Sequence, residues 1–170
     1  MDKLKISVRE IALFGILGAL TFGLKFAMSW LPNIEPVSLL VMLFAVTFGV
    51  KCLCPIYVYV ALELFLYGIG DWSLMYLYLW ALLALLAWCM RKTKEPLAWA
   101  LLAAFFGLFF EILGSPVYML FGGVSYAIAK CVSGITFSIY HCIGNFALVL
   151  LLFAPLRKLL EKLYHKLITV

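Results

Sequence analysis

The lysines and arginines of this chain fall into four groups, and the stretches between the groups are apolar and long enough to cross a membrane. If these stretches are taken as pairs of spans, eleven of the 13 cations lie on one side of a bilayer. This is the positive-inside pattern, and it predicts a polytopic protein of a bacterial-type cytoplasmic membrane with both termini in the cytoplasm. The groups are Lys3, Lys5 and Arg9; Lys51; Arg91, Lys92 and Lys94; and Arg157, Lys158, Lys162 and Lys166.

The composition indicates that lipid is the solvent for much of the chain. Its 170 residues are 67% hydrophobic and only 12% charged, whereas a soluble domain is about half apolar. A helical span needs about 20 apolar residues, so the length admits about five to seven spans and no separate soluble domain. We therefore predict an all-α fold with one integral membrane domain over residues 1–170.

Helix-breaking residues divide the chain into six expected spans. Pro32 and Pro36 end the first, because proline cannot continue a helix. Residues 37–69 are expected to form two spans, since one helix of that length would extend about 50 Å and place Lys51 midway. The first apolar run has no clear small-residue cleavage site and is interpreted as a retained span. The expected spans cover about 11–30, 37–50, 53–69, 73–90, 97–114 and 131–154, with an interfacial helical tail over 155–170.

The course of the chain after the fifth span has two interpretations. Gly114, Ser115 and Pro116 are expected to break or kink that span, because glycine and proline both disfavour a continuous helix. The residues from Val117 to Lys130 then either finish the span or form an outer loop with a short helix.

Polar residues within the expected spans are the candidates for a binding site, since a charged group in hydrocarbon costs at least about 2–3 kcal/mol. They lie in the outer halves of the third, fifth and sixth spans, and His141 and Asn145 share one helical face. Glu35 in the first outer loop lies at a similar depth, and an aromatic cluster with Trp72 and Tyr76 lies at the same face. This predicts an aromatic-lined cavity open to the outside that suits a polar heterocycle. The predicted substrate-binding residues are Glu35, Glu63, Trp72, Tyr76, Glu111, His141 and Asn145.

Several of these residues also have a structural interpretation. Trp72 and Tyr76 fit an interfacial aromatic belt, and His141 with Asn145 fits hydrogen bonding between helices. Glu111 could form a structural ion pair with Lys25 or Lys130. If Lys25 is not paired in this way, its long side chain is expected to extend to the outer membrane interface.

No pattern of an enzyme, metal site, cofactor site or nucleic-acid site is found. Walker A, Gly-x-Ser-x-Gly and His-Glu-x-x-His motifs are missing, so the chain is not expected to be an enzyme or to use ATP itself. The basic groups have no interleaved aromatic residues, which favours attraction to anionic lipid over nucleic acid. Metal binding by the closely spaced Cys52 and Cys54 is not expected, because on a helix they point to different faces.

The first expected span has a stripe of small residues, Gly15, Ala19 and Gly23, spaced by four. Such a stripe lets another helix approach closely. It indicates either packing within the protein or docking of a partner membrane protein.

With these features the chain resembles an S component of an energy-coupling factor (ECF) transporter, the substrate-binding membrane subunit of vitamin importers. The resemblance rests on the size, on six spans with both ends inside, on the stripe Gly15-x-x-x-Ala19-x-x-x-Gly23, which is close to the family's Ala-x-x-x-Ala motif, and on two segments. These segments are residues 31–36, LPNIEP, and residues 133–146, which begin SGITF and end HCIGNF.

The resemblance implies a role in capturing a vitamin-like small molecule from outside, in a pocket that the later spans build and the loop after the first span caps. It implies a T subunit and two ATPase subunits as partners, with Gly15, Ala19 and Gly23 facing the T subunit. Toppling of the S component would then release the substrate inward. No pocket residue carries over by motif.

Three other function classes stay open at this point. One is a stand-alone proton-coupled carrier that uses Glu63 and Glu111 as proton relays. Another is an intramembrane enzyme that uses His141 with Glu111. The last is an assembly protein without a ligand.

Overall fold

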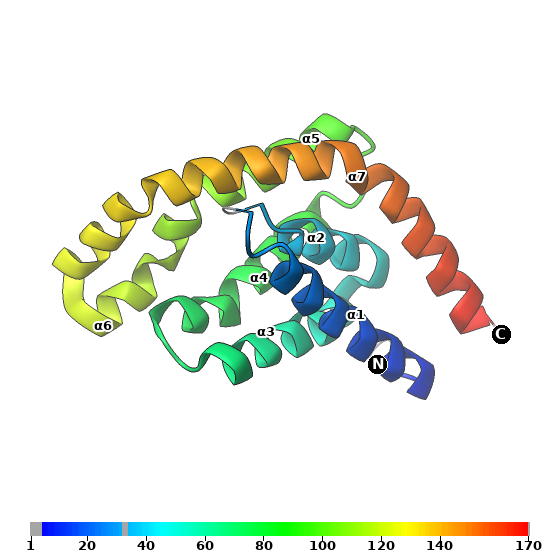
Figure 1. The fold of residues 1–170 in the computed structure, drawn as a ribbon. Helices are drawn as coiled ribbons and strands as arrows, with labels where there is room; N and C mark the ends of the chain where they lie inside the picture. Colours follow the sequence, from blue (N-terminus) through cyan, green and yellow to red (C-terminus); the bar gives the residue numbers. More distant parts are fainter. Residues whose placement is uncertain (1–4, 32–33, 170) are drawn as a thin grey trace.

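The computed structural model describes residues 5–31 and 34–169, and these residues form helices joined by short turns (Figure 1). The all-α prediction is confirmed for this part of the chain. The expected break at Pro32 and Asn33 lies outside the described residues. The helices are α1 (Val8–Ala27), α2 (Val37–Phe48), the 3-10 helix η2 (Gly49–Cys52), α3 (Leu53–Tyr67), α4 (Asp71–Cys89), α5 (Pro96–Leu108), α6 (Phe110–Ser133) and α7 (Ile135–Thr169).

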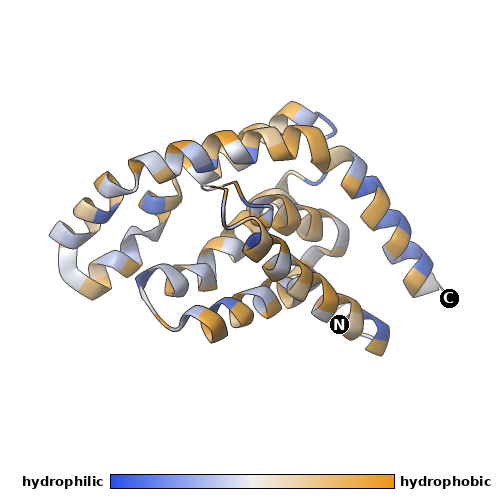
Figure 2. Ribbon diagram, viewed as in Figure 1, coloured by the Kyte–Doolittle hydropathy of each residue, from blue (hydrophilic) through white to orange (hydrophobic). Residues whose placement is uncertain are grey.

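The helices have the length and apolar character of membrane spans. In the described residues, five helical stretches are long and apolar enough to cross a membrane. Figure 2 shows hydrophobic residues along most helices, with hydrophilic residues gathered in the C-terminal part of α7. The chain therefore has the helices of a multi-pass membrane protein. The stretches are Val8–Ala27, Val37–Tyr67, Asp71–Cys89, Pro96–Ser133 and Ile135–Leu167.

The stretch Val37–Tyr67 contains two helices that run in opposite directions. Lys51 lies beside Glu10 near the start of α1, and Glu63 lies beside Lys25 near its end, so α3 runs parallel to α1. Helix α2 begins at the other end of the fold and ends near Lys51, so it runs antiparallel to α1 and α3. The reversal starts at Gly49, whose φ of 58° lies in the left-handed region that glycine enters without a steric penalty.

The described basic groups meet at one end of the fold, which we call the basic end. Lys51 Nζ and the Tyr164 hydroxyl each donate a hydrogen bond of 2.6 Å to Oε1 of Glu10. Arg157 Nη2 donates to the carbonyl of Arg91 at 3.4 Å. The first residues of α1, the turn after α2, the turn after α4 and the last turns of α7 are therefore neighbours.

The predicted break at Gly114, Ser115 and Pro116 is wrong. The helix continues through all three residues, and the interruptions lie at Phe109 and at Gly122–Gly123. Gly123 has a φ of 74°, which favours glycine over residues with a Cβ atom. The two interpretations of the stretch Val117–Lys130 are resolved as a helix that bends sharply at this glycine pair (Figure 1).

Helix α7 begins later than its predicted span, because residues 131–133 belong to α6, and it continues well beyond the predicted end at residue 154. It begins at Ile135 and continues through Pro155 to Thr169. Its 35 residues extend about 52 Å, well beyond the ~30 Å of hydrocarbon. The expected tail is helical but also packed, because the Tyr164 ring lies 4.8 Å from the Phe48 ring.

Helices α5 and α7 pack tightly in an antiparallel pair. Trp99 near the start of α5 stacks on Phe153 of α7, with ring centroids 4.5 Å apart. At the other end of α5, a Cβ atom on Gly107 would lie 2.9 Å from the carbonyl oxygen of His141. Glycine at this position therefore lets the two backbones touch.

We expect Gly107→Ala to lower the free energy of unfolding by about 1–3 kcal/mol, because the added methyl group meets backbone atoms that cannot move freely. Gly23→Ala is the matched control, since nothing lies within 4 Å of its added Cβ. The control should be neutral or stabilising by up to about 1 kcal/mol. Thermal unfolding of both purified variants checks this, and equal stability would contradict the close approach of α5 and α7.

Candidate functional site

A cavity of about 310 Å³ lies at the end of the fold opposite the basic end. Its wall combines one lysine and one glutamate with aromatic and other apolar side chains. We call this end the acidic end, because Glu35, Glu63, Asp71 and Glu111 lie there with Lys25 and Lys130. The residues that line the cavity are Lys25, Met28, Ser29, Leu31, Ile34, Glu35, Tyr67, Trp72, Met75, Tyr76, Phe110 and Phe137.

Lys25 is the central charged group of the cavity. Its Nζ donates to Oε2 of Glu63 at 2.9 Å and to the Tyr76 hydroxyl at 3.2 Å. The Lys25 side chain is 19% exposed, and Glu63 is only 1% exposed. The second Glu63 oxygen makes no hydrogen bond among the described residues. Helices α1, α3 and α4 thus meet at a largely buried ion pair beneath the cavity.

Glu35 and His141 form a second polar pair beside the first. Glu35 precedes α2, and its Oε1 lies 3.8 Å from Nε2 of His141 on α7, which is too long for a hydrogen bond. The His141 side chain is fully buried, and neither ring nitrogen has a hydrogen-bond partner in the described part of the chain. Burial raises the pKa of Glu35, and the positive charge of Lys25 opposes that rise.

Aromatic rings surround these charges. The Lys25 ammonium lies 4.9 Å from the ring centre of Tyr76 and 5.7 Å from that of Trp72. His141 lies between Phe110 and Phe137, with ring centres 5.2 and 5.4 Å away. The site therefore has faces on which a flat ring can stack and which attract a cation.

Asn145 lies outside the cavity lining and joins three helices. Its Nδ2 donates to Oγ of Ser38 on α2 at 3.1 Å and to the carbonyl of Ala103 on α5 at 3.2 Å. Both the Asn145 side chain and Ser38 are buried. These contacts fit the interpretation of hydrogen bonding between helices.

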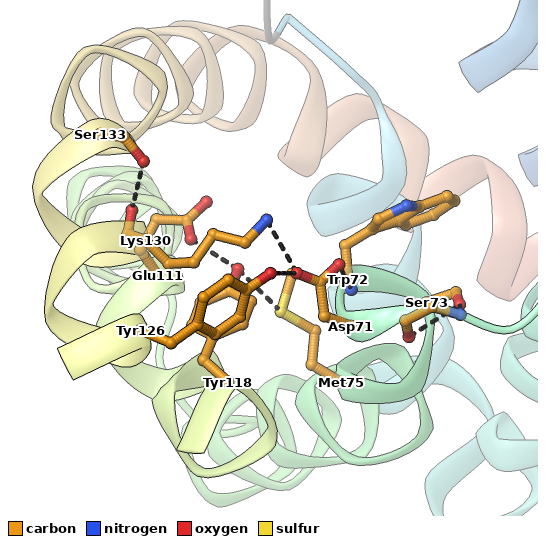
Figure 3. Close-up of polar contacts among 10 residues, drawn as sticks. Asp71, Trp72, Ser73, Met75, Glu111, Tyr118, Tyr126, Lys130 and Ser133 are labelled. Carbon is orange, nitrogen blue, oxygen red and sulfur yellow. Dashed lines mark hydrogen bonds and ion pairs between the residues drawn. The ribbon is translucent and has the colours of Figure 1, made fainter. Parts of the chain in front are cut away.

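Glu111 belongs to a separate cluster between α4 and α6 (Figure 3). It accepts a hydrogen bond of 2.6 Å from the Tyr118 hydroxyl. Beside it, Lys130 and Tyr126 both reach Oδ2 of Asp71, at 2.8 and 2.7 Å. The expected ion pairing of Glu111 with Lys25 or Lys130 is not found, because Lys25 pairs with Glu63 and Lys130 with Asp71.

The structure thus brings together some of the predicted site residues and leaves others apart. Glu35, Trp72 and Tyr76 line the cavity, Glu63 supports it through Lys25, and His141 lies behind Glu35. Asn145 and Glu111 lie outside the lining.

The sequence analysis missed the role of Lys25, which was expected to reach the interface and instead turns inward. In the structure, Lys25 continues the face of α1 on which Phe14, Gly18 and Thr21 are buried. Apolar residues such as Ile16 and Leu20 lie on the exposed faces of the same helix, so the sequence pattern did not mark the inward face.

The stripe of small residues on α1 faces away from the rest of the protein. In the part of the chain that the structure describes, no atom lies within 4 Å of a Cβ atom built on Gly15 or Gly23, and Ala19 is exposed. Gly18 is the small residue that packs internally, against Pro55 and Val58 of α3. The stripe therefore remains open to lipid or to a partner.

No protein-family model, no curated protein and no solved structure matches this chain. A function is therefore inferred from the cavity and from the exposed surface of α1.

Proposed function

We propose that this protein is the substrate-binding S component of an ECF-type importer that captures a vitamin-like small molecule. The observation that carries the proposal is the 310 Å³ cavity at the acidic end, with Lys25 and Glu35 set among aromatic rings. Ligand pockets of about 300–1,000 Å³ with few polar groups in an apolar wall are typical of small-molecule sites.

The charge distribution supports an orientation in which this cavity opens to the outside. Apart from Lys25 and Lys130, the described lysines and arginines lie at the basic end, and in inner membranes such residues lie on the cytoplasmic side. The contacts among helices fit six passes, since α2 and α3 each run between the two ends. Under this orientation the start of α1 and the end of α7 lie inside. Five described residues between α1 and α2 line the cavity, namely Met28, Ser29, Leu31, Ile34 and Glu35.

The exposed stripe on α1 supports a partner within the membrane. Gly15, Ala19 and Gly23 leave a smooth surface that another helix can approach closely. A T subunit that carries two ATPase subunits is the proposed partner, and the chain itself supplies neither a nucleotide site nor a cofactor.

The test separates binding from transport. The purified subunit is screened by thermal shift against water-soluble vitamins and their precursors, because a ligand of the folded state raises its apparent stability. We expect binding by the subunit alone and accumulation in vesicles only with the T subunit, the ATPases and ATP. Accumulation by the subunit alone, driven by a pH gradient, would instead support the stand-alone proton-coupled carrier.

A further inference from the structure

The formal charges of the side chains at the acidic end do not balance. Two lysines face four carboxylates there, which gives a net charge of −2 with histidines counted as neutral. Glu63 is paired with Lys25, and Asp71 is paired with Lys130. Among the described residues, Glu35 and Glu111 have no lysine or arginine within ion-pair distance.

Glu35 is the one of these two that faces the cavity. Glu111 accepts the Tyr118 hydroxyl hydrogen bond and lies outside the lining. Among the described residues, Glu35 has a long contact to His141 and is influenced by the charge of Lys25 without an ion pair to it, and its side chain is 15% exposed. A carboxylate removed from water without a partner is unfavourable, and a bound positive charge relieves that cost.

We infer that the cavity takes a small organic cation whose positive group pairs with Glu35 and whose ring lies among Trp72, Phe110 and Phe137. This inference depends on the proposed function in one respect, because it takes the cavity to be the substrate site. The aromatic wall already attracts one cation, because the Lys25 ammonium lies within 6 Å of the ring centres of Trp72 and Tyr76. Attraction of a cation to such ring faces is strongest where water is excluded.

An anionic ligand fits the same geometry poorly. The cation that it would need is Lys25, and Lys25 is already bound to Glu63 and Tyr76. An anion that displaced Glu63 would leave a carboxylate of 1% exposure without a partner, which is strongly unfavourable. A bare metal ion fits poorly too, because the described residues contain no group of three or more metal-ligating side chains.

Three isosteric probes separate charge from shape: the benzamidinium cation, neutral benzamide and anionic benzoate. Ligand-observed NMR with the purified wild-type subunit measures each affinity at millimolar probe concentrations. We expect the cation to bind roughly tenfold more tightly than benzamide, as one charge-assisted contact predicts, and benzoate to bind more weakly than benzamide. Glu35→Gln should remove the preference, whereas Glu95→Gln, which deletes the same charge at the basic end, should keep it.

Two results would overturn the inference. One is binding of benzoate that is as tight as, or tighter than, binding of benzamidinium. The other is no detectable binding of benzamidinium. Both are read on the wild-type protein, so they hold even if Glu35→Gln fails to fold. They are also independent of the proposed importer, which stands or fails on ATP-dependent accumulation with the T subunit and ATPases.

Discussion

Replacing Lys25 with methionine is expected to lower the free energy of unfolding by about 3–5 kcal/mol, because it leaves a buried carboxylate without its counter-charge. Glu63 is 1% exposed, and Lys25 is its ion-pair partner among the described residues. The same change removes the hydrogen bond from Lys25 to the Tyr76 hydroxyl. Thermal unfolding of the purified variant in detergent measures the loss.

Two further variants make this expectation specific. Lys25→Met combined with Glu63→Gln should recover most of the lost stability, since no unpaired charge remains. Lys130→Met is the matched control, because Lys130 also pairs with a carboxylate but is 35% exposed. A more exposed pair contributes about 0–1 kcal/mol. Equal losses for Lys25→Met and Lys130→Met would mean that the pair beneath the cavity is solvated.

Replacing Ala19 with tryptophan is expected to lower ATP-dependent accumulation by roughly tenfold or more while leaving ligand affinity unchanged. Ala19 lies at the centre of the exposed stripe on α1, away from the cavity lining. The added ring therefore blocks close approach of a partner helix without entering the site. Accumulation in vesicles and binding to the isolated subunit are measured on the same preparation.

Leu20→Trp is the control for this change. Leu20 is also exposed on α1 but points about 100° away from Ala19 around the helix. It should retain accumulation. If Ala19→Trp instead weakened binding while the subunits still assembled, the docking role proposed for the stripe would be wrong.

Part of the cavity could be predicted from residue types alone. Trp72, Tyr76 and Glu35 lie near the expected outer ends of spans, where an aromatic wall and a polar group meet. The inward orientation of Lys25 could not be predicted, because apolar residues such as Ile16 and Leu20 lie on the exposed faces of the same helix. The position of Glu111 could not be predicted either, because the sequence does not reveal how α6 turns at Gly122–Gly123 and brings Tyr118 to it.

The break predicted at Gly114–Pro116 shows a related limit. Local preference favours a break at proline, yet packing keeps this segment helical and moves the interruptions to Phe109 and to the glycine pair. Tertiary contacts stabilise a helix by more than a single unfavourable residue costs, so the course of residues 115–130 was open until the packing was known.

By itself the sequence determined the all-α class, the apolar helices and the separation of the basic groups from the acidic end, because each depends on composition and on spacing along the chain. Only the tertiary structure decided that Lys25 pairs with Glu63, that Glu35 is left facing the cavity and that Glu111 is not. Those outcomes depend on the rotation and the approach of helices distant in the chain, which bring together a few polar groups out of many possible pairs.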